Sequence, residues 1–195
     1  MRSGKHSQVA RYHRMTNELV DVGASFSGME RNHLFVNLAG KNFQELSGLS
    51  GIDSPGDART HVRLDFNRDG FPDVALVNAN APFFQLFRNR VGQRSAHRFF
   101  ALRLHGGNQT ASRSSKWSNR DGVGARIQVY VDDRVLVREL RAGEGFGGQN
   151  SKTLLIGLGE HDRADRVGIR WPSGVEQVLD QIPAGVLLHA FENAT

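Results

Sequence analysis

The sequence predicts an all-β protein, with a blade-like antiparallel β unit packed on a C-terminal β-sandwich-like domain. From residue 33 onward, short segments alternate apolar and polar residues, which is the pattern of half-buried strands. Clusters of Gly, Pro, Asn, Asp and Ser separate these segments and mark turns. A chain of 195 residues fits one large or two small domains and can bury roughly 70% of its unfolded surface.

One helix is expected, from Ser7 to Val20, because its apolar residues recur at roughly helical spacing and Ser7 is a suitable N-cap. Residues 106–120 are rich in Gly, Ser and other polar residues and predict a long loop. The expected strands cover residues 33–38, 59–66, 74–78, 83–88, 98–105, 125–131, 135–140, 153–158, 166–171, 175–179 and 187–191.

Pro172, Ser173 and Gly174 have the chemistry of a three-residue hairpin loop, with proline entering the turn and glycine in the left-handed position. The hairpin joins two strands whose alternate residues are apolar. We expect those residues to line a sheet core; they are Val167, Ile169 and Trp171 before the turn and Val175, Gln177 and Leu179 after it.

The run from Asp65 to Asp73 sets oxygen-bearing side chains at its first, third, fifth and ninth positions around Gly70. Calcium takes six to eight oxygen ligands, and a glycine permits the sharp turn that brings them together. A bound cation would also offset the repulsion among three nearby carboxylates. The expected Ca²⁺ ligands are the side chains of Asp65, Asn67, Asp69 and Asp73 and the backbone carbonyl of Phe71.

This loop is not an EF-hand, because its twelfth position is Leu76 instead of glutamate and its flanks have the pattern of strands. The alternative is a plain hairpin. Asp-Gly is a favoured two-residue turn, and the acidic side chains around it would then simply be solvated.

Three segments beside this loop carry a family resemblance: Asn32-His33-Leu34-Phe35-Val36-Asn37-Leu38, Asn42-Phe43-Gln44-Glu45-Leu46 and Gln85-Leu86-Phe87-Arg88-Asn89. Together with the loop they resemble the FG-GAP or VCBS type of repeat found in integrin-like propeller blades. A closed propeller needs at least four blades, and one clear cation loop is present. The resemblance therefore implies either a piece of a larger protein or a short member of the family.

Four segments of the second half follow in order: Ser118-Asn119-Arg120-Asp121-Gly122-Val123-Gly124-Ala125-Arg126, Arg138-Glu139-Leu140-Arg141-Ala142-Gly143, Gly157-Leu158-Gly159 and Arg170-Trp171-Pro172-Ser173-Gly174. They resemble the ASPIC and UnbV domain, which closes proteins of the cartilage acidic protein family. The resemblance as a whole implies an N-terminal segment at 1–30, a repeat at 31–92 and the ASPIC and UnbV-like domain at 97–192. The resemblance also implies that this chain is a calcium-binding protein that is secreted or at the cell surface, or else a protein of a bacterial biosynthetic cluster.

The chain has no cysteine, which excludes disulfides, thiolate metal sites and a catalytic thiol. Its net charge is +5 and its pI about 10.2, but arginines and acids are interspersed along the chain. That distribution does not favour a nucleic-acid protein, whereas an anionic polysaccharide or an acidic protein partner remains an expected class of ligand. No apolar run is long enough for a membrane span or a signal peptide, and no pattern indicates an oligomeric state.

Further motifs have a structural interpretation. Residues 143–148 contain a literal G-x-G-x-x-G, but a strand pattern follows where a dinucleotide fold needs a helix. Residues 119–122 repeat the centre of the calcium loop without an acid equivalent to Asp73, and predict a turn. His97 and His105 share a strand face by even spacing. No residue in this sequence is assigned to a transition metal.

Glu139 and Glu144 lie near Arg138 and Arg141, which predicts either a salt-bridged strand edge or an acid/base pair. The sequence favours a non-enzymatic, calcium-stabilised protein of extracellular or cell-surface recognition or adhesion. The alternative is an enzyme or ligand-sequestering protein of a bacterial biosynthetic pathway, with a pocket near Phe146 and Trp117. Calcium is expected to be structural in the first case, because six protein ligands leave little room for a reactive water.

Overall fold

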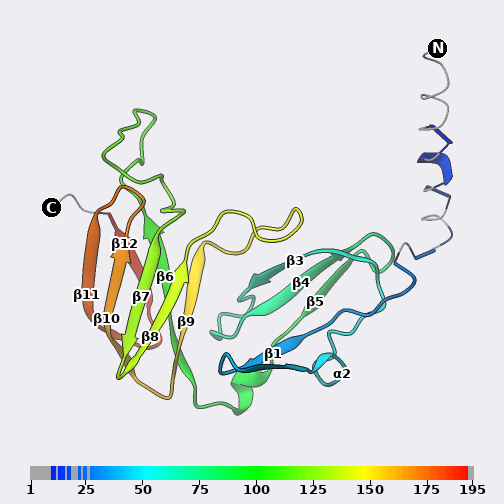
Figure 1. Ribbon diagram of the computed structural model, residues 1–195, viewed down its shortest axis with the longest axis horizontal. Helices are drawn as coiled ribbons and strands as arrows, with labels where there is room; N and C mark the ends of the chain where they lie inside the picture. Colours follow the sequence, from blue (N-terminus) through cyan, green and yellow to red (C-terminus); the bar gives the residue numbers. More distant parts are fainter. Residues whose placement is uncertain are drawn as a thin grey trace. The chain divides into compact units, whose positions relative to one another are not determined.

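The computed structural model describes residues 10–11, 13–15, 17–18, 22, 24–25 and 27–192. These residues form twelve strands and only short helical segments, so the prediction of an all-β chain is confirmed (Figure 1). Within the predicted N-terminal helix, residues 10–11, 13–15 and 17–18 are helical. The rest of that prediction lies outside the described residues.

The C-terminal part contains two β-sheets. The first has the strand order β12-β6-β9, and the second has the order β11-β10-β7-β8. All pairings are antiparallel except that β12 runs parallel to β6. The strands are β6 (Arg98–His105), β7 (Arg126–Val131), β8 (Arg134–Glu139), β9 (Thr153–Gly159), β10 (Arg163–Arg170), β11 (Glu176–Pro183) and β12 (Leu187–Phe191).

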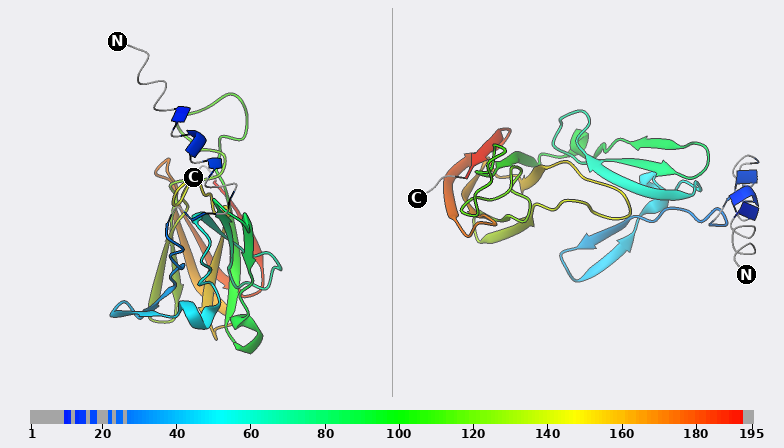
Figure 2. Two further views of the ribbon diagram at one scale, coloured as in Figure 1. Left: turned by 90° about the vertical axis from the view of Figure 1, so that its right-hand side faces the viewer. Right: turned by 90° about the horizontal axis from the view of Figure 1, so that it is seen from above.

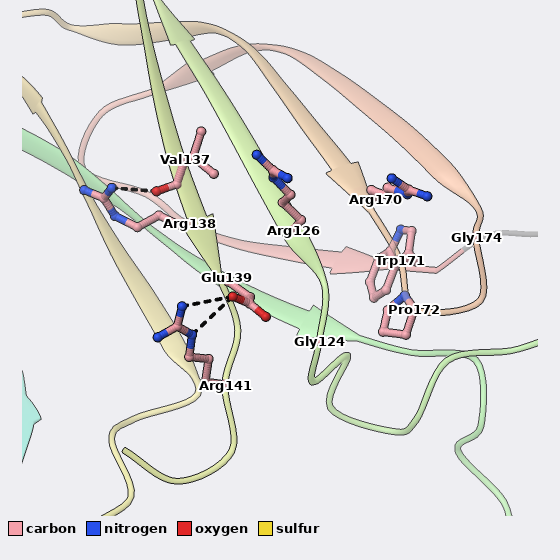
Figure 3. Close-up of a pocket in the computed structure, with 10 residues that line it drawn as sticks. All are labelled: Gly124, Arg126, Val137, Arg138, Glu139, Arg141, Arg170, Trp171, Pro172 and Gly174. Carbon is pink, nitrogen blue, oxygen red and sulfur yellow. Dashed lines mark hydrogen bonds and ion pairs between the residues drawn. The ribbon is translucent and has the colours of Figure 1, made fainter. Parts of the chain in front are cut away.

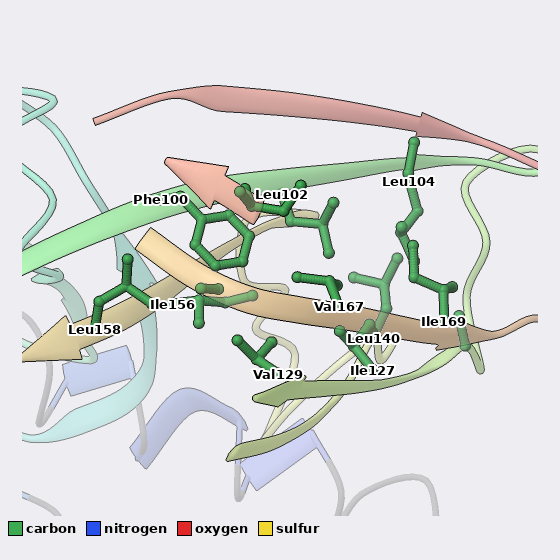
Figure 4. Packing of buried hydrophobic residues seen from close by; sticks show 14 of the residues in the cluster. Phe100, Leu102, Leu104, Ile127, Val129, Leu140, Ile156, Leu158, Val167 and Ile169 are labelled. Atoms are coloured by element: carbon green, nitrogen blue, oxygen red, sulfur yellow. The ribbon is translucent and has the colours of Figure 1, made fainter. Parts of the chain in front are cut away.

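The core of this part lies between the two sheets, where strands β6, β7, β9 and β10 supply most of the buried side chains (Figure 4). Phe100, Leu102 and Leu104 project from β6, while Ile127 and Val129 meet them from β7. The expectation for the Pro172 hairpin is confirmed for its first strand, because Val167, Ile169 and Trp171 are at most 1% exposed. Two sheets that share such a core form the predicted β-sandwich-like domain.

The remaining elements form two smaller sheets. β1 (Phe35–Leu38) and β2 (Asn42–Glu45) pair as an antiparallel hairpin, which appears as a two-stranded ribbon in Figure 2. β3 (Ala58–Leu64), β4 (Asp73–Asn78) and β5 (Phe84–Phe87) form a sheet in that order. Helix α2 (Ser47–Ser50) and a 3-10 helix (Val91–Arg94) complete the described elements. β2 was not among the predicted strands, because its residues Asn-Phe-Gln-Glu are mostly polar and all exposed.

The chain divides into two compact units, each with its own internal contacts. One contains Met1–His61 and Ala75–Phe87, and the other contains Val62–Val74 and Arg88–Thr195. The loop predicted to bind calcium therefore belongs to the same unit as the C-terminal sheets, although it lies far from them in the sequence. The predicted division at 1–30, 31–92 and 97–192 follows the family resemblance and stays a prediction.

Candidate metal centre between strands β3 and β4

In the loop between β3 and β4, half-buried and exposed side chains alternate, as expected for a loop whose alternate side chains bind a cation. Asp65, Asn67 and Asp69 are half-buried, whereas Phe66 and Arg68 between them are exposed. The odd-numbered side chains therefore turn inward. The chain can reverse within so few residues because it adopts left-handed backbone, with φ of 59° at residue 68 and 84° at residue 70.

The carboxylates of this loop already hold its backbone. Asp65 accepts hydrogen bonds from the amides of Asp69 and Gly70, at 3.0 and 2.9 Å. Asp69 accepts one from the Phe71 amide at 3.0 Å and one from Asn67 Nδ2 at 2.6 Å. Each carboxylate has about four acceptor positions, so these bonds fix the loop and leave lone pairs on both groups for a cation.

Asp73, the ninth residue of the loop, is fully buried at the start of β4. Its Oδ2 accepts a hydrogen bond from the Phe66 amide at 2.9 Å, and its Oδ1 accepts one from the Asn89 amide at 2.7 Å. The side chain of Asn89 donates in turn to the carbonyl of Pro72 at 3.2 Å. Asp73 therefore ties the start of the loop to the segment that leads into the C-terminal sheets.

One oxygen of the loop has no partner. Asn67 Oδ1 is buried and accepts no hydrogen bond, and a buried oxygen without a donor is costly. Calcium prefers such amide and carboxylate oxygens, so the donor set fits this cation. Across the described part of the chain, however, no group of three or more His, Cys, Asp and Glu residues is arranged to hold a metal. Metal binding by Asp65, Asn67, Asp69, Phe71 and Asp73 stays a prediction.

The two glutamates predicted as a salt-bridged edge or an acid/base pair each form a separate ion pair. Glu139 pairs with Arg141 at 3.1 Å, whereas Glu144 pairs with Arg63 at 2.9 Å and is also hydrogen-bonded to Asn150. The two glutamates therefore have separate cationic partners. This arrangement agrees with the salt-bridge interpretation of that sequence and gives no acid/base pair.

The glycine-rich segment at residues 143–148 forms a loop before a strand, and residues 119–122 form a turn, as the sequence predicted. Gly143, Gly145 and Gly147 all have positive φ, and strand β9 follows them as expected. Within the loop, Phe146 is 81% exposed. In the turn at residues 119–122, Gly122 has a φ of 67°, and Asp121 pairs with Lys152 and Arg103. The hydrogen bond from Lys152 lowers the pKa of Asp121.

A pair of histidines on neighbouring strands was not predicted. Nε2 of His105 lies 2.8 Å from Nδ1 of His189, and the ring of His105 stacks on both His189 and Phe191. Burial lowers the pKa of His105, and the charges of His189 and Arg103 lower it further. The sequence placed His105 on one strand face with His97 and predicted isolated surface histidines. The actual pair depends on the parallel pairing of β12 with β6, which residue spacing within one strand cannot indicate.

A buried carboxylate after β12 was also not predicted. Glu192 is 6% exposed and accepts hydrogen bonds from the amides of Gly107 and Ser118, at 2.7 and 2.8 Å. The hydroxyls of Ser118 and Ser173 donate to it as well. Burial alone would raise the pKa of Glu192, but these hydrogen bonds outweigh it and lower the pKa. We call this arrangement the Glu192 clamp.

The comparisons with known proteins concern the sandwich. No match to a curated protein is found for the chain. Within the residues that the structure describes, no helix is both long and apolar enough to cross a membrane. The family model for ASPIC and UnbV matches residues 115–195, a range that includes strands β7 to β12 but begins after β6. The FG-GAP or VCBS resemblance of residues 31–92 stays a prediction. An ASPIC and UnbV domain is thus found at residues 115–195 of this chain.

Proposed function

We propose that this protein is a calcium-stabilised binding module that works in recognition outside the cell or at its surface. The observation that carries the proposal is the buried, unpartnered Oδ1 of Asn67, in a loop whose acidic side chains turn inward beside it. A cation would satisfy that oxygen and reduce the repulsion among the neighbouring carboxylates. The ASPIC and UnbV domain supports the location, because domains of this kind are often extracellular.

The role assigned to the ion is structural. The loop residues that would hold it are Asp65, Asn67, Asp69 and Asp73, with the carbonyl of Phe71. Two of these carboxylates already bind backbone amides within the loop, and the third reaches Asn89 beyond β5. A cation at these oxygens would therefore stiffen the β3–β4 connection and the segment entering β6. Ligand binding would take place elsewhere, on the exposed faces of the sheets.

Calcium titration of metal-free protein by calorimetry tests the proposal. One main site is expected, with thermal unfolding shifted upward by calcium and back by a chelator. Free calcium at 100 times its dissociation constant stabilises a protein by about 2.7 kcal/mol. Asn67→Ala should weaken binding because it removes the amide oxygen, whereas Asn67→Asp keeps an oxygen at that position and should retain binding.

Asp133→Asn is the matched control for Asp69→Asn. Asp133 is exposed in the β7–β8 turn, so its substitution removes the same charge far from the loop in sequence. Calcium binding should be lost in Asp69→Asn and unchanged in Asp133→Asn. An unaltered stoichiometry in Asp69→Asn and Asn67→Ala would reject the site. Loss of an enzymatic turnover in a folded Asn67→Ala variant that still binds calcium would instead favour the enzyme alternative.

A further inference from the structure

The outer face of the sheet β11-β10-β7-β8 carries a row of four charged residues. Cross-strand pairing places Arg170 opposite Arg126, with Glu176 beyond Arg170 and Glu139 beyond Arg126. The row therefore reads acid, base, base, acid across four neighbouring strands, which lie about 4.8 Å apart. Like charges directly opposite each other destabilise a sheet, so the central arginine pair has a cost in the free protein.

No ion pair within the described part of the chain offsets that cost. Among the described residues, neither Arg126 nor Arg170 makes an ion pair, although each has a glutamate as its cross-strand neighbour. Glu139 is bound instead by Arg141, through two nitrogens at 3.1 and 3.2 Å. Figure 3 shows Arg126 and Arg170 on adjacent strands, at positions that pair across β7 and β10. Both keep their forked N–H donors free for an added anion.

These arginines lie at an open depression of about 600 Å³, with Val137 and Trp171 also in its lining (Figure 3). A second depression of about 390 Å³ continues from it along the strands and shares Arg126 and Arg170. Ligand sites commonly fall between about 300 and 1,000 Å³. The two depressions together make one shallow groove over the sheet, which we call the arginine groove.

At the base of the arginine groove, Gly168 contributes no side chain. This residue lies opposite Gln128 on β7 and Val178 on β11, at a position where the alternation points a side chain outward. A Cβ at Gly168 would meet only the Gln128 carbonyl oxygen, at 3.9 Å. Further along, Arg166 lies over the ring of Tyr130, 5.2 Å from its centre. The groove thus offers arginine, amide and phenol groups around an empty centre.

We propose that the arginine groove binds an acidic polysaccharide through carboxylate groups on its sugar rings. A guanidinium pairs with a carboxylate through two parallel hydrogen bonds, which a lysine cannot do. A carboxylate between Arg126 and Arg170 would remove the repulsion of the two charges. The inference rests on the recognition role proposed above, but it does not depend on calcium.

The glutamates at the ends of the row favour a sugar over other anions. A nucleic acid or an acidic peptide carries negative charge throughout, so it would meet repulsion at Glu176, which has no ion pair among the described residues, and less at Glu139, which Arg141 binds. A polymer of uronic acid has one carboxylate on each ring, and the remaining hydroxyl groups lie on other carbons of the same and neighbouring rings. Hydroxyls donate hydrogen bonds to carboxylates, so the acid, base, base, acid row matches a polymer in which hydroxyl donors separate the carboxylates.

Calorimetry with a hexasaccharide of galacturonic acid tests this proposal, on the whole chain at 0.15 M salt without added calcium. The protein is expected to bind the galacturonic acid hexasaccharide. It should bind hexaglutamate and a DNA hexamer more weakly, and it should not bind a neutral glucose hexasaccharide. Arg126→Gln/Arg170→Gln should weaken uronate binding by at least about tenfold. Arg126→Lys/Arg170→Lys keeps the charge but loses the forked geometry, and should still weaken binding.

The matched control is Arg113→Gln/Arg134→Gln, which removes the same charge from two exposed arginines that do not line the groove. It should bind uronate within about twofold of the parent. Gly168→Val tests the groove without a change of charge. The position has room for a side chain and lies within a strand, so the variant should unfold at the same or a higher temperature and yet lose uronate binding.

Equal loss in both double glutamine variants, or parent-like binding by Gly168→Val, would overturn the proposal. If the protein bound hexaglutamate or DNA as tightly as it binds the uronate, the proposal would be overturned in favour of an acidic peptide or a nucleic acid. The calcium proposal is judged separately. The arginine variants should bind calcium like the parent, and Asn67→Ala should still bind uronate. Failure of calcium binding alone would leave the arginine groove standing.

Discussion

Gly70 lies so close to Phe99 that a Cβ on the glycine would come within 1.8 Å of Cε1 of the ring. The glycine also has a φ of 84°, which ordinary side chains rarely adopt. The turn of the predicted calcium loop therefore rests directly on an aromatic residue of β6. This contact joins the loop to the sheet of the sandwich that contains β12, β6 and β9.

Gly70→Ala should destabilise the protein by about 1–3 kcal/mol, because left-handed backbone and the clash with Phe99 both oppose the methyl group. Urea unfolding measures the change. Gly70→Ala/Phe99→Leu should recover part of the loss, since the smaller side chain relieves the clash but not the backbone strain. Strict additivity of the two substitutions would show that the residues do not interact. Gly174→Ala is a useful comparison, because its φ is 95° and no atom lies within 4 Å of the added methyl group.

The Glu192 clamp should make the sandwich sensitive to acid. The hydrogen bonds hold the folded pKa of Glu192 below its ordinary value of 4.5, so the unfolded state binds the proton more readily. The stabilisation is then fully present above pH 4.5 and is lost as the pH falls through the folded pKa. Glu192→Gln should cost about 2 kcal/mol at neutral pH and flatten the decline below pH 4.5.

Thermal unfolding from pH 3 to pH 7 checks this prediction. Glu176→Gln is the control, because Glu176 is exposed on β11 and has no comparable hydrogen bonds among the described residues. If both variants show the same acid profile as the parent, the clamp does not account for the acid sensitivity.

The His105 pair should add a second pH dependence, between neutral and mildly acidic conditions. Burial and the positive neighbours His189 and Arg103 lower the folded pKa of His105 below 6.5, while Asp121 acts in the opposite sense. The unfolded state then gains its proton first as the pH falls, so stability decreases below pH 6.5 until the folded pKa is passed. His105→Phe keeps a ring on Phe191 but cannot titrate, so its melting temperature should change less between pH 7 and pH 5.

NMR titration of the histidine ring protons gives the direct measurement. His97→Asn is the control, because it removes a histidine outside the stacked cluster and should leave the profile unchanged. A His105 signal that titrates above pH 6.5, or a parent-like profile in His105→Phe, would contradict this explanation.

A fragment of residues 97–195 should fold without the rest of the chain. Every residue of the large hydrophobic cluster lies between Phe100 and Ala190, and the strand pairings that enclose it lie between Arg98 and Phe191. Circular dichroism and dispersed proton NMR signals are the measurements. The fragment loses the Gly70 contact with Phe99 and the ion pair between Arg63 and Glu144, so it should be less stable than the whole chain. An unfolded fragment would show that the predicted boundary at residue 97 cuts a shared core.

Strand positions were largely predictable, because alternation is a local property. The buried set Val167, Ile169 and Trp171 was identified from spacing alone, and the same spacing places Arg166 and Arg170 on the outer face. Strand β2 was missed because its four residues carry little apolar signal, and the strand depends on pairing with β1. The pattern of acids also placed Asp65, Asn67 and Asp69 on one side of their loop.

Pairings between distant segments were not predictable in this way. The parallel contact of β12 with β6 joins residues more than eighty positions apart, as His105 and His189 show with a separation of 84. Glu192 reaches Gly107 over 85 positions. The arginine groove likewise needs the register of β7 on β10, which sets Arg126 against Arg170. The alternation of residues shows which side chains share one face of a strand, but it does not show which other strand pairs with it.

The Glu192 clamp also bears on the order of events during synthesis. Strand β6 lies at the centre of its sheet, yet one of its two neighbours, β12, is made after all the other described strands. Until the ribosome has released residue 192, β6 has an open edge and the amides of Gly107 and Ser118 lack their carboxylate. An open strand edge is a site for wrong pairing between chains. Slow emergence of the segment that contains β12 would therefore lengthen the time in which nascent copies can aggregate.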